Sequence, residues 1–201
     1  MLDGGMRRLI DPPLNRAGRV LAAWGVSAAA VTFFGLALGL GAALVLALGL
    51  PGWAAIVLLL AGRVADGLDG AVARASASTD LGGFLDILCD FVFYGALPLA
   101  FALRDPASAL PAVFLLFSFY VNAASFLGFA ILAEKRGIKT SAQGQKSLYY
   151  SAGLMEGTET ILFFAAMCVW PGAFAPLAWG FGGLCLLTAA GRAALAARLF
   201  R

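Results

Sequence analysis

Long apolar runs separated by short polar segments make up most of the chain. The runs are about 20 residues or longer, the length an α-helix needs to cross the hydrocarbon core of a bilayer. We therefore predict an all-α polytopic membrane protein that forms a single membrane domain over residues 1–201, with six transmembrane helices. The first expected span covers about residues 26–50, and the second runs from the Pro51–Gly52 turn to about residue 74. The other four cover about residues 81–103, 107–132, 152–170 and 176–195.

Residues 1–23 differ from these runs because basic residues are mixed with apolar ones. Arg16 and Arg19 lie in the second half, and Pro12 and Pro13 interrupt the segment. We predict an interfacial amphipathic helix near residues 14–23, with its basic residues against lipid phosphates. A disordered basic tail is the alternative, because the two prolines disfavour a helix interior.

Lysine and arginine gather on one side of the expected membrane. Both terminal segments and the Lys135–Lys146 loop are basic, whereas Arg104 alone occupies a loop on the opposite side. The positive-inside rule then places both termini in the cytoplasm. We expect a multi-pass protein of the bacterial inner (plasma) membrane.

Composition excludes several classes of function. Hydrophobic residues make up 62% of the chain and charged residues 12%, and there is no histidine, which excludes imidazole catalysis. The net charge of +3 is too small to indicate nucleic-acid binding. Cys89, Cys168 and Cys185 lie in apolar runs without the spacing of a disulfide framework or a zinc site.

Four carboxylates interrupt the apolar pattern. Asp66 and Asp69 are three residues apart in the second run, and Asp86 and Asp90 are four apart in the third, so each pair shares one helix face. The short polar link 76–80 between the runs predicts an antiparallel helical hairpin. We expect the four carboxylates to meet at matching depths.

Carboxylates so close repel one another where the dielectric is low, and ionisable residues inside apolar spans are functional candidates by default. Without histidine, the ligands are all oxygen, which favours Mg²⁺ or Mn²⁺, and four carboxylates suit two such ions. Asp80 is different because it follows Ser78 and Thr79 at the start of a helix, so we interpret it as a cap or a surface charge.

This stretch resembles the signature of the CDP-alcohol phosphatidyltransferase family, D-x-x-D-G-x-x-A-R followed by G-x-x-x-D-x-x-x-D. In this sequence the motif is Asp66, Asp69, Gly70, Ala73, Arg74, Gly82, Asp86 and Asp90. It departs from the family in one respect, because seven residues instead of about eight separate Arg74 from Gly82. We expect a shorter turn that leaves the carboxylate faces intact.

The resemblance implies transfer of a phosphatidyl group from a CDP-alcohol, most simply CDP-diacylglycerol, to an acceptor alcohol in phospholipid biosynthesis, with release of CMP. It also implies a homodimer. By the same resemblance Asp66, Asp69 and Asp86 are metal ligands, and Asp90 is a shared ligand or the catalytic general base. Gly70, Ala73 and Arg74 match family positions near the CDP moiety, with Arg74 contacting a phosphate; a snorkelling arginine at the membrane edge is the alternative.

The acceptor alcohol is less constrained. The basic residues Lys135, Arg136, Lys139 and Lys146 could bind a small, phosphorylated acceptor, or they could form an ordinary positive-inside loop.

Other polar residues also have two interpretations. Glu156 and Glu159 could support these lysines or touch the acceptor, or they could form an acidic helix start. Asn122 and Ser125 could form interhelical hydrogen bonds or line the substrate cavity.

A divalent-cation transporter of the inner membrane is the rival interpretation, because intramembrane carboxylates would also serve it. A permeation path needs polar groups across the whole bilayer, however, and the outer halves of the spans carry almost none. The sequence therefore favours the enzyme.

Overall fold

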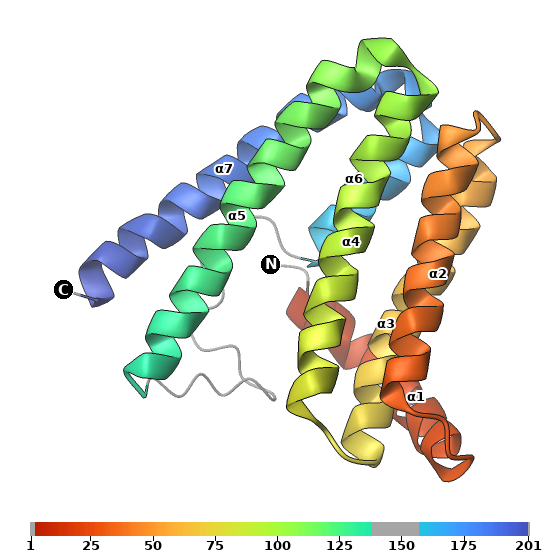
Figure 1. Cartoon of the computed structure of the whole chain (residues 1–201), viewed down its shortest axis with the longest axis vertical. Coiled ribbons are helices and arrows are strands. Elements are labelled where there is room, and N and C mark those ends of the chain that lie inside the picture. Colours follow the sequence, from red (N-terminus) through yellow and green to blue (C-terminus); the bar gives the residue numbers. More distant parts are fainter. Residues whose placement is uncertain (1–2, 138–156, 201) are drawn as a thin grey trace.

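The computed structural model describes residues 3–137 and 157–200, and this part of the chain is almost entirely helical (Figure 1). The α-helices are α1 (Asp3–Ala23), α2 (Ala28–Ala47), α3 (Gly52–Ala75), α4 (Asp80–Arg104), α5 (Ala109–Lys135), α6 (Gly157–Val169) and α7 (Phe174–Leu199). Two single-turn 3₁₀ helices, η1 (Pro106–Ser108) and η2 (Pro171–Ala173), precede α5 and α7. The all-α prediction is confirmed.

Four helical segments are long and apolar enough to cross a membrane: α2, α4, α5 with η1, and α7 with η2. Their ends lie within a few residues of the predicted spans. The other two predicted spans correspond to α3, which carries four charged side chains, and to α6, which has 13 residues in the described part of the chain. The protein is thus a helical membrane protein with four clear candidate spans.

The outer surface of the helices suits a lipid environment. Large apolar side chains such as Phe34, Phe117 and Ile131 are exposed. Exposed tryptophans lie near helix ends, with Trp24 between α1 and α2, and Trp53 and Trp170 at the opposite end of the molecule. Tryptophan is enriched at membrane–water interfaces, so the two ends match the two interfaces of a bilayer.

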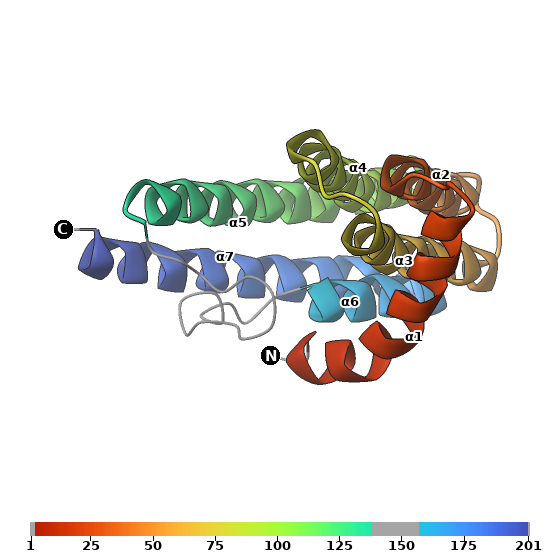
Figure 2. The ribbon, with the colours of Figure 1, turned by 90° about the horizontal axis from the view of Figure 1, so that it is seen from below.

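The helices form two groups that share an aromatic core. Helix α2 packs against both α3 and α4, whereas α3 and α4 make few close contacts with each other. Helices α5 and α7 lie side by side (Figures 1 and 2). Buried phenylalanines join the groups: Phe93 of α4 contacts Phe164 of α6, which in turn contacts Phe181 of α7.

Glycines bring α2 and α3 into close contact. A Cβ atom placed on Gly35 would lie 3.2 Å from the carbonyl oxygen of Gly62, and one placed on Gly62 would lie 3.0 Å from the carbonyl oxygen of Gly35. Such small residues let two helix backbones approach closely in a membrane. One turn from Gly35 lies Thr32, which is thereby held against α3.

Helix α1 is longer than predicted. It begins at Asp3 and continues through Pro12 and Pro13, so the helix predicted near residues 14–23 is present and extends further towards the N-terminus. Seen from below, α1 changes direction along its length, as missing backbone hydrogen bonds at prolines allow (Figure 2). It packs against α3, where a Cβ on Gly18 would come within 2.7 Å of Ala71.

The predicted helical hairpin is present. Helix α3 ends at Ala75 and α4 begins at Asp80, so the connection is short, as the motif spacing indicated. The N-cap is Thr79, whose hydroxyl accepts a hydrogen bond from the Gly82 backbone N–H at 3.1 Å. Asp80 is therefore a residue of the first turn and not the cap itself. Its negative charge there interacts favourably with the helix dipole.

Candidate metal and substrate site

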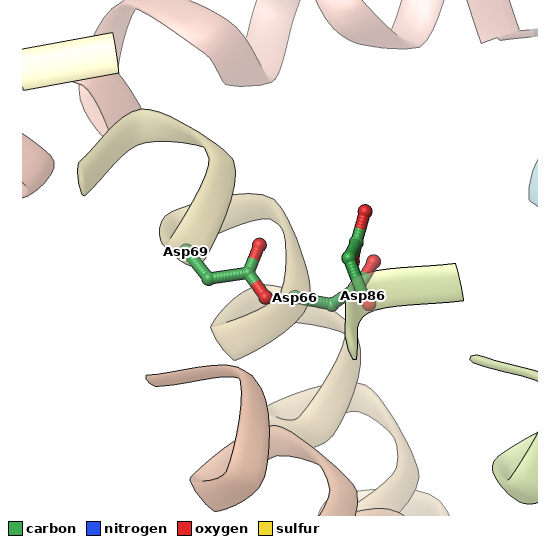
Figure 3. Close-up of side chains that lie close together, drawn as sticks. All are labelled: Asp66, Asp69 and Asp86. Carbon is green, nitrogen blue, oxygen red and sulfur yellow. The ribbon is translucent and has the colours of Figure 1, made fainter. Parts of the chain in front are cut away.

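Three of the four motif aspartates converge between α3 and α4. One carboxylate oxygen from each of Asp66, Asp69 and Asp86 lies within 4.8 Å of the others (Figure 3). The spacing of three residues on α3 directs Asp66 and Asp69 to one face, and the hairpin brings Asp86 of α4 opposite them. Three converging oxygen ligands are a suitable arrangement for a hard divalent cation.

Thr32 of α2 fixes the innermost of these carboxylates. Its hydroxyl lies 2.6 Å from Asp69 Oδ2, close enough to donate a short hydrogen bond, and both residues are buried, with 7% and 5% exposure. Sequence reasoning missed Thr32, although it is the only hydrogen-bonding side chain in α2. A single hydroxyl in an otherwise apolar helix is the signal that could have identified it.

Arg63 of α3 is a second residue that sequence reasoning missed. Its Nη1 lies 2.8 Å from Asp90 Oδ1 and 3.4 Å from Asp66 Oδ1. The sequence analysis therefore overlooked a guanidinium one helical turn before Asp66. The signal was present, because an arginine within an apolar run is as unusual as an aspartate there.

Asp90 does not join the three-carboxylate cluster. It lies one turn beyond Asp86 on α4 and accepts a hydrogen bond from Arg63. We expected the four carboxylates to meet in one group. The structure instead shows a group of three, with Asp90 beside it.

The residues expected near the CDP moiety lie at the end of α3 next to α1. Arg74 is exposed and donates from Nη2 to Asn15 Oδ1 at 2.9 Å. A Cβ atom on Gly70 would lie 3.2 Å from Arg74 Nη1, so the glycine leaves room for the guanidinium. Ala73 is half-buried on the same helix. The contact between Arg74 and Asn15 ties α1 to this end of the site.

The basic residues expected to bind the acceptor lie only partly in the described chain. Lys135 is exposed in the last turn of α5. Arg136 donates to the backbone carbonyl oxygens of Leu199 at 3.2 Å and Phe200 at 2.7 Å, at the C-terminal end of α7. Arginine there satisfies carbonyl groups that the helix leaves unpaired. Lys139, Lys146 and Glu156 lie outside the described residues.

Asn122 and Ser125 form interhelical hydrogen bonds, the first of the two predicted roles. Arg192 of α7 donates from Nη1 to Asn122 Oδ1 at 3.0 Å and to Ser125 Oγ at 2.6 Å. These bonds join α5 to α7 inside the membrane domain. Glu159 lies half-buried in the first turn of α6, as an acidic helix start would.

The fold and the site together define a helical membrane protein with an oxygen-only acidic centre between α3 and α4. Comparison with known families identifies the class further. The family model described as CDP-alcohol phosphatidyltransferase matches residues 26–190, and the chain belongs to this family. The resemblance seen in the motif is confirmed, and the protein is an enzyme of this class.

Two known proteins are similar to this chain. The chain is 46% identical over 191 residues to inner membrane protein YnjF of Escherichia coli K12, covering 94% of this chain and 91% of that protein. It also shares its fold with the crystal structure of Mycobacterium tuberculosis phosphatidylinositol phosphate synthase with CDP-DAG bound. That likeness has a TM-score of 0.66 at 21% identity and covers 89% of this chain and 90% of the other.

Proposed function

We propose that the protein transfers a phosphatidyl group from a CDP-alcohol, most directly CDP-diacylglycerol, to a small acceptor alcohol in phospholipid biosynthesis, releasing CMP. The observation that carries this proposal is the convergence of Asp66, Asp69 and Asp86 at the family motif. The structural neighbour solved with CDP-DAG supports the choice of donor.

The reaction requires a nucleophile, a base and neutralised phosphate oxygens. The acceptor hydroxyl oxygen forms a bond to the lipid-side phosphorus, the bond from that phosphorus to the CMP oxygen breaks, and the hydroxyl proton goes to a base. Asp90 is our candidate for that base, because it lies one turn from Asp86 but outside the cluster. Mg²⁺ or Mn²⁺ bound by the cluster would neutralise charge on the pyrophosphate.

Substrate binding involves two regions in this proposal. Gly70, Ala73 and Arg74 face the CDP moiety, and Asn15 of α1 orients the Arg74 guanidinium for a phosphate. The basic residues Lys135, Arg136, Lys139 and Lys146 form the second region in this proposal and attract a phosphorylated acceptor by their charge. Arg136 would serve it indirectly, because it holds the end of α7.

The proposed topology has six spans, an interfacial α1 and a single domain over residues 1–201. Helix α3 has 24 residues, about 36 Å at 1.5 Å per residue, so it is long enough to cross a bilayer despite its charges. The excess of lysine and arginine near the motif supports a cytoplasmic active site and cytoplasmic termini in a bacterial inner membrane. A homodimer follows from the family resemblance.

The experiment that tests this function follows CMP release from purified protein in detergent. The protein is incubated with CDP-diacylglycerol, Mg²⁺ or Mn²⁺ and a panel of free and phosphorylated alcohols. We expect CMP with one class of acceptor, none after EDTA treatment, and recovery on adding metal. The Asp86→Asn variant is the negative control. If the wild type releases no CMP with any acceptor, yet carries Mn²⁺ into proteoliposomes, the transferase proposal is refuted in favour of the rival transporter.

A further inference from the structure

Arg63 places a positive charge against two of the four motif carboxylates. Its Nη1 is 2.8 Å from Asp90 and 3.4 Å from Asp66, and only 14% of its side chain is exposed. Asp66 also belongs to the cluster with Asp69 and Asp86. A cation bound by this cluster would therefore leave Asp66 between two centres of positive charge, that cation and the guanidinium of Arg63.

The guanidinium is held on its other side by an aromatic ring. Arg63 Cζ lies 4.1 Å from the centroid of the Phe93 ring, a cation–π distance. Phe93 is fully buried, and its ring packs so closely on α2 that a Cβ on Gly39 would come within 2.6 Å of it. Arg63 is thus confined between a fixed ring and two carboxylates.

The hydrogen bonding of Arg63 is incomplete. Its Nε is buried and has no hydrogen-bond partner among the described residues. Buried donors are normally paired, so an arginine with a purely structural role would be expected to satisfy this group. Charge and ring stacking hold this side chain instead, as expected of a counter-cation for the carboxylates.

We propose that Arg63 occupies the place of a second divalent ion, so that the resting enzyme binds one ion at Asp66, Asp69 and Asp86 while Arg63 positions Asp90 outside that ion's coordination. This rests on the proposed function and revises the expectation of two ions. A second ion would have to share Asp66 and Asp90 with a guanidinium already at 3.4 and 2.8 Å, where like charges repel. Arg63 is accordingly a positioning residue that holds the Asp90 carboxylate by a hydrogen bond, one helical turn beyond Asp86.

The number of bound ions can be measured without any reaction. Purified protein in detergent, with no CDP-alcohol, is titrated with Mn²⁺, and free Mn²⁺ is followed by electron paramagnetic resonance. We expect one ion per chain in the wild type and in Arg63→Lys, which keeps the charge. We expect two in Arg63→Gln, because Asp66 and Asp90 are then released to a second ion. Two ions in the wild type, or a single ion in Arg63→Gln, would overturn the proposal.

A second variant keeps the test decisive if Arg63→Gln does not fold. In Asp90→Asn the count should stay at one, since Asp90 is not a ligand of the resting ion, and loss of that ion would refute the proposal. CMP release is measured on the same samples. If the wild type binds one Mn²⁺ but releases no CMP, only the proposed function is refuted. If the wild type binds two Mn²⁺ and releases CMP, only this inference is refuted.

Discussion

Replacing Thr32 with valine removes one hydroxyl from the acidic centre and preserves the shape of the side chain. The lost group is the donor at 2.6 Å from Asp69 Oδ2, in a place where both residues are almost fully buried. Water cannot readily replace the donor there. Asp69 then loses the contact that fixes its orientation towards Asp66 and Asp86.

The size of the effect follows from the type of bond. A hydrogen bond to a charged group contributes about 1.5–3 kcal/mol, and about 1.4 kcal/mol corresponds to a factor of ten. Thr32→Val should therefore weaken Mn²⁺ binding by roughly 10- to 150-fold. Removing a residue that hydrogen-bonds to a metal ligand typically lowers metal affinity or activity by about 10- to 100-fold, and this range agrees with the expected loss of Mn²⁺ affinity.

The assay is calorimetric titration of Mn²⁺ into wild type, Thr32→Val and Thr32→Ser, with CMP release measured at low and saturating Mn²⁺. Serine keeps the hydroxyl, so Thr32→Ser should retain most of the affinity, whereas Thr32→Val should need more metal for the same turnover. Equal affinity in wild type and Thr32→Val would refute the reasoning, as would a serine variant as weak as the valine variant. Melting temperatures identify any variant that is merely unfolded.

Three further outcomes are expected. Gly35→Ala should lower the melting temperature and the turnover, because its Cβ would lie 3.2 Å from atoms of α3 and overpacking costs about 1–3 kcal/mol. Gly41→Ala is the matched control and should change little, since its Cβ would have its nearest neighbour at 3.5 Å. Asp90→Asn should release CMP about 10²- to 10⁴-fold more slowly, the usual contribution of a general base, and unchanged turnover would exclude it from that role. A cysteine placed at Ser76 should be labelled only from the cytoplasmic side and one at Asp105 only from outside; labelling in the reverse sense would invert the proposed topology.

Much of the fold could be predicted because the apolar runs match bilayer thickness. The boundaries of α2 and α4 fall within a few residues of the predicted spans, since loss of hydrophobicity and a turn signal coincide there. Helix α1 was predicted less well. The rule that proline ends a helix describes an isolated segment, whereas α1 packs along α3, and contacts such as Gly18 against Ala71 offset the missing hydrogen bonds.

The site was predictable where the chemistry lies within one short motif. Asp66, Asp69 and Asp86 follow from helix periodicity and a short link. Thr32 and Arg63 do not, because their roles depend on which helix packs beside α3 and on a side chain from α4. Periodicity gives the face of a helix but not the neighbour that covers it, so the partner of Asp69, 37 residues away, needed the structure.

The short distance between Arg63 and Asp66 along α3 has a consequence for how the protein enters the membrane. On the proposed topology α3 is inserted before α4 has been synthesised, so Asp90 cannot yet neutralise the arginine. Each charged residue at the centre of an inserting helix costs about 2.5–3.5 kcal/mol. The pair within one turn of α3 gives Arg63 a partner from its own helix at that stage. The hydroxyl and glycines of α2 give α3 a polar and closely fitting surface to pack against during insertion. Insertion of α3 together with α2, as a hairpin, is therefore favoured over insertion of α3 alone.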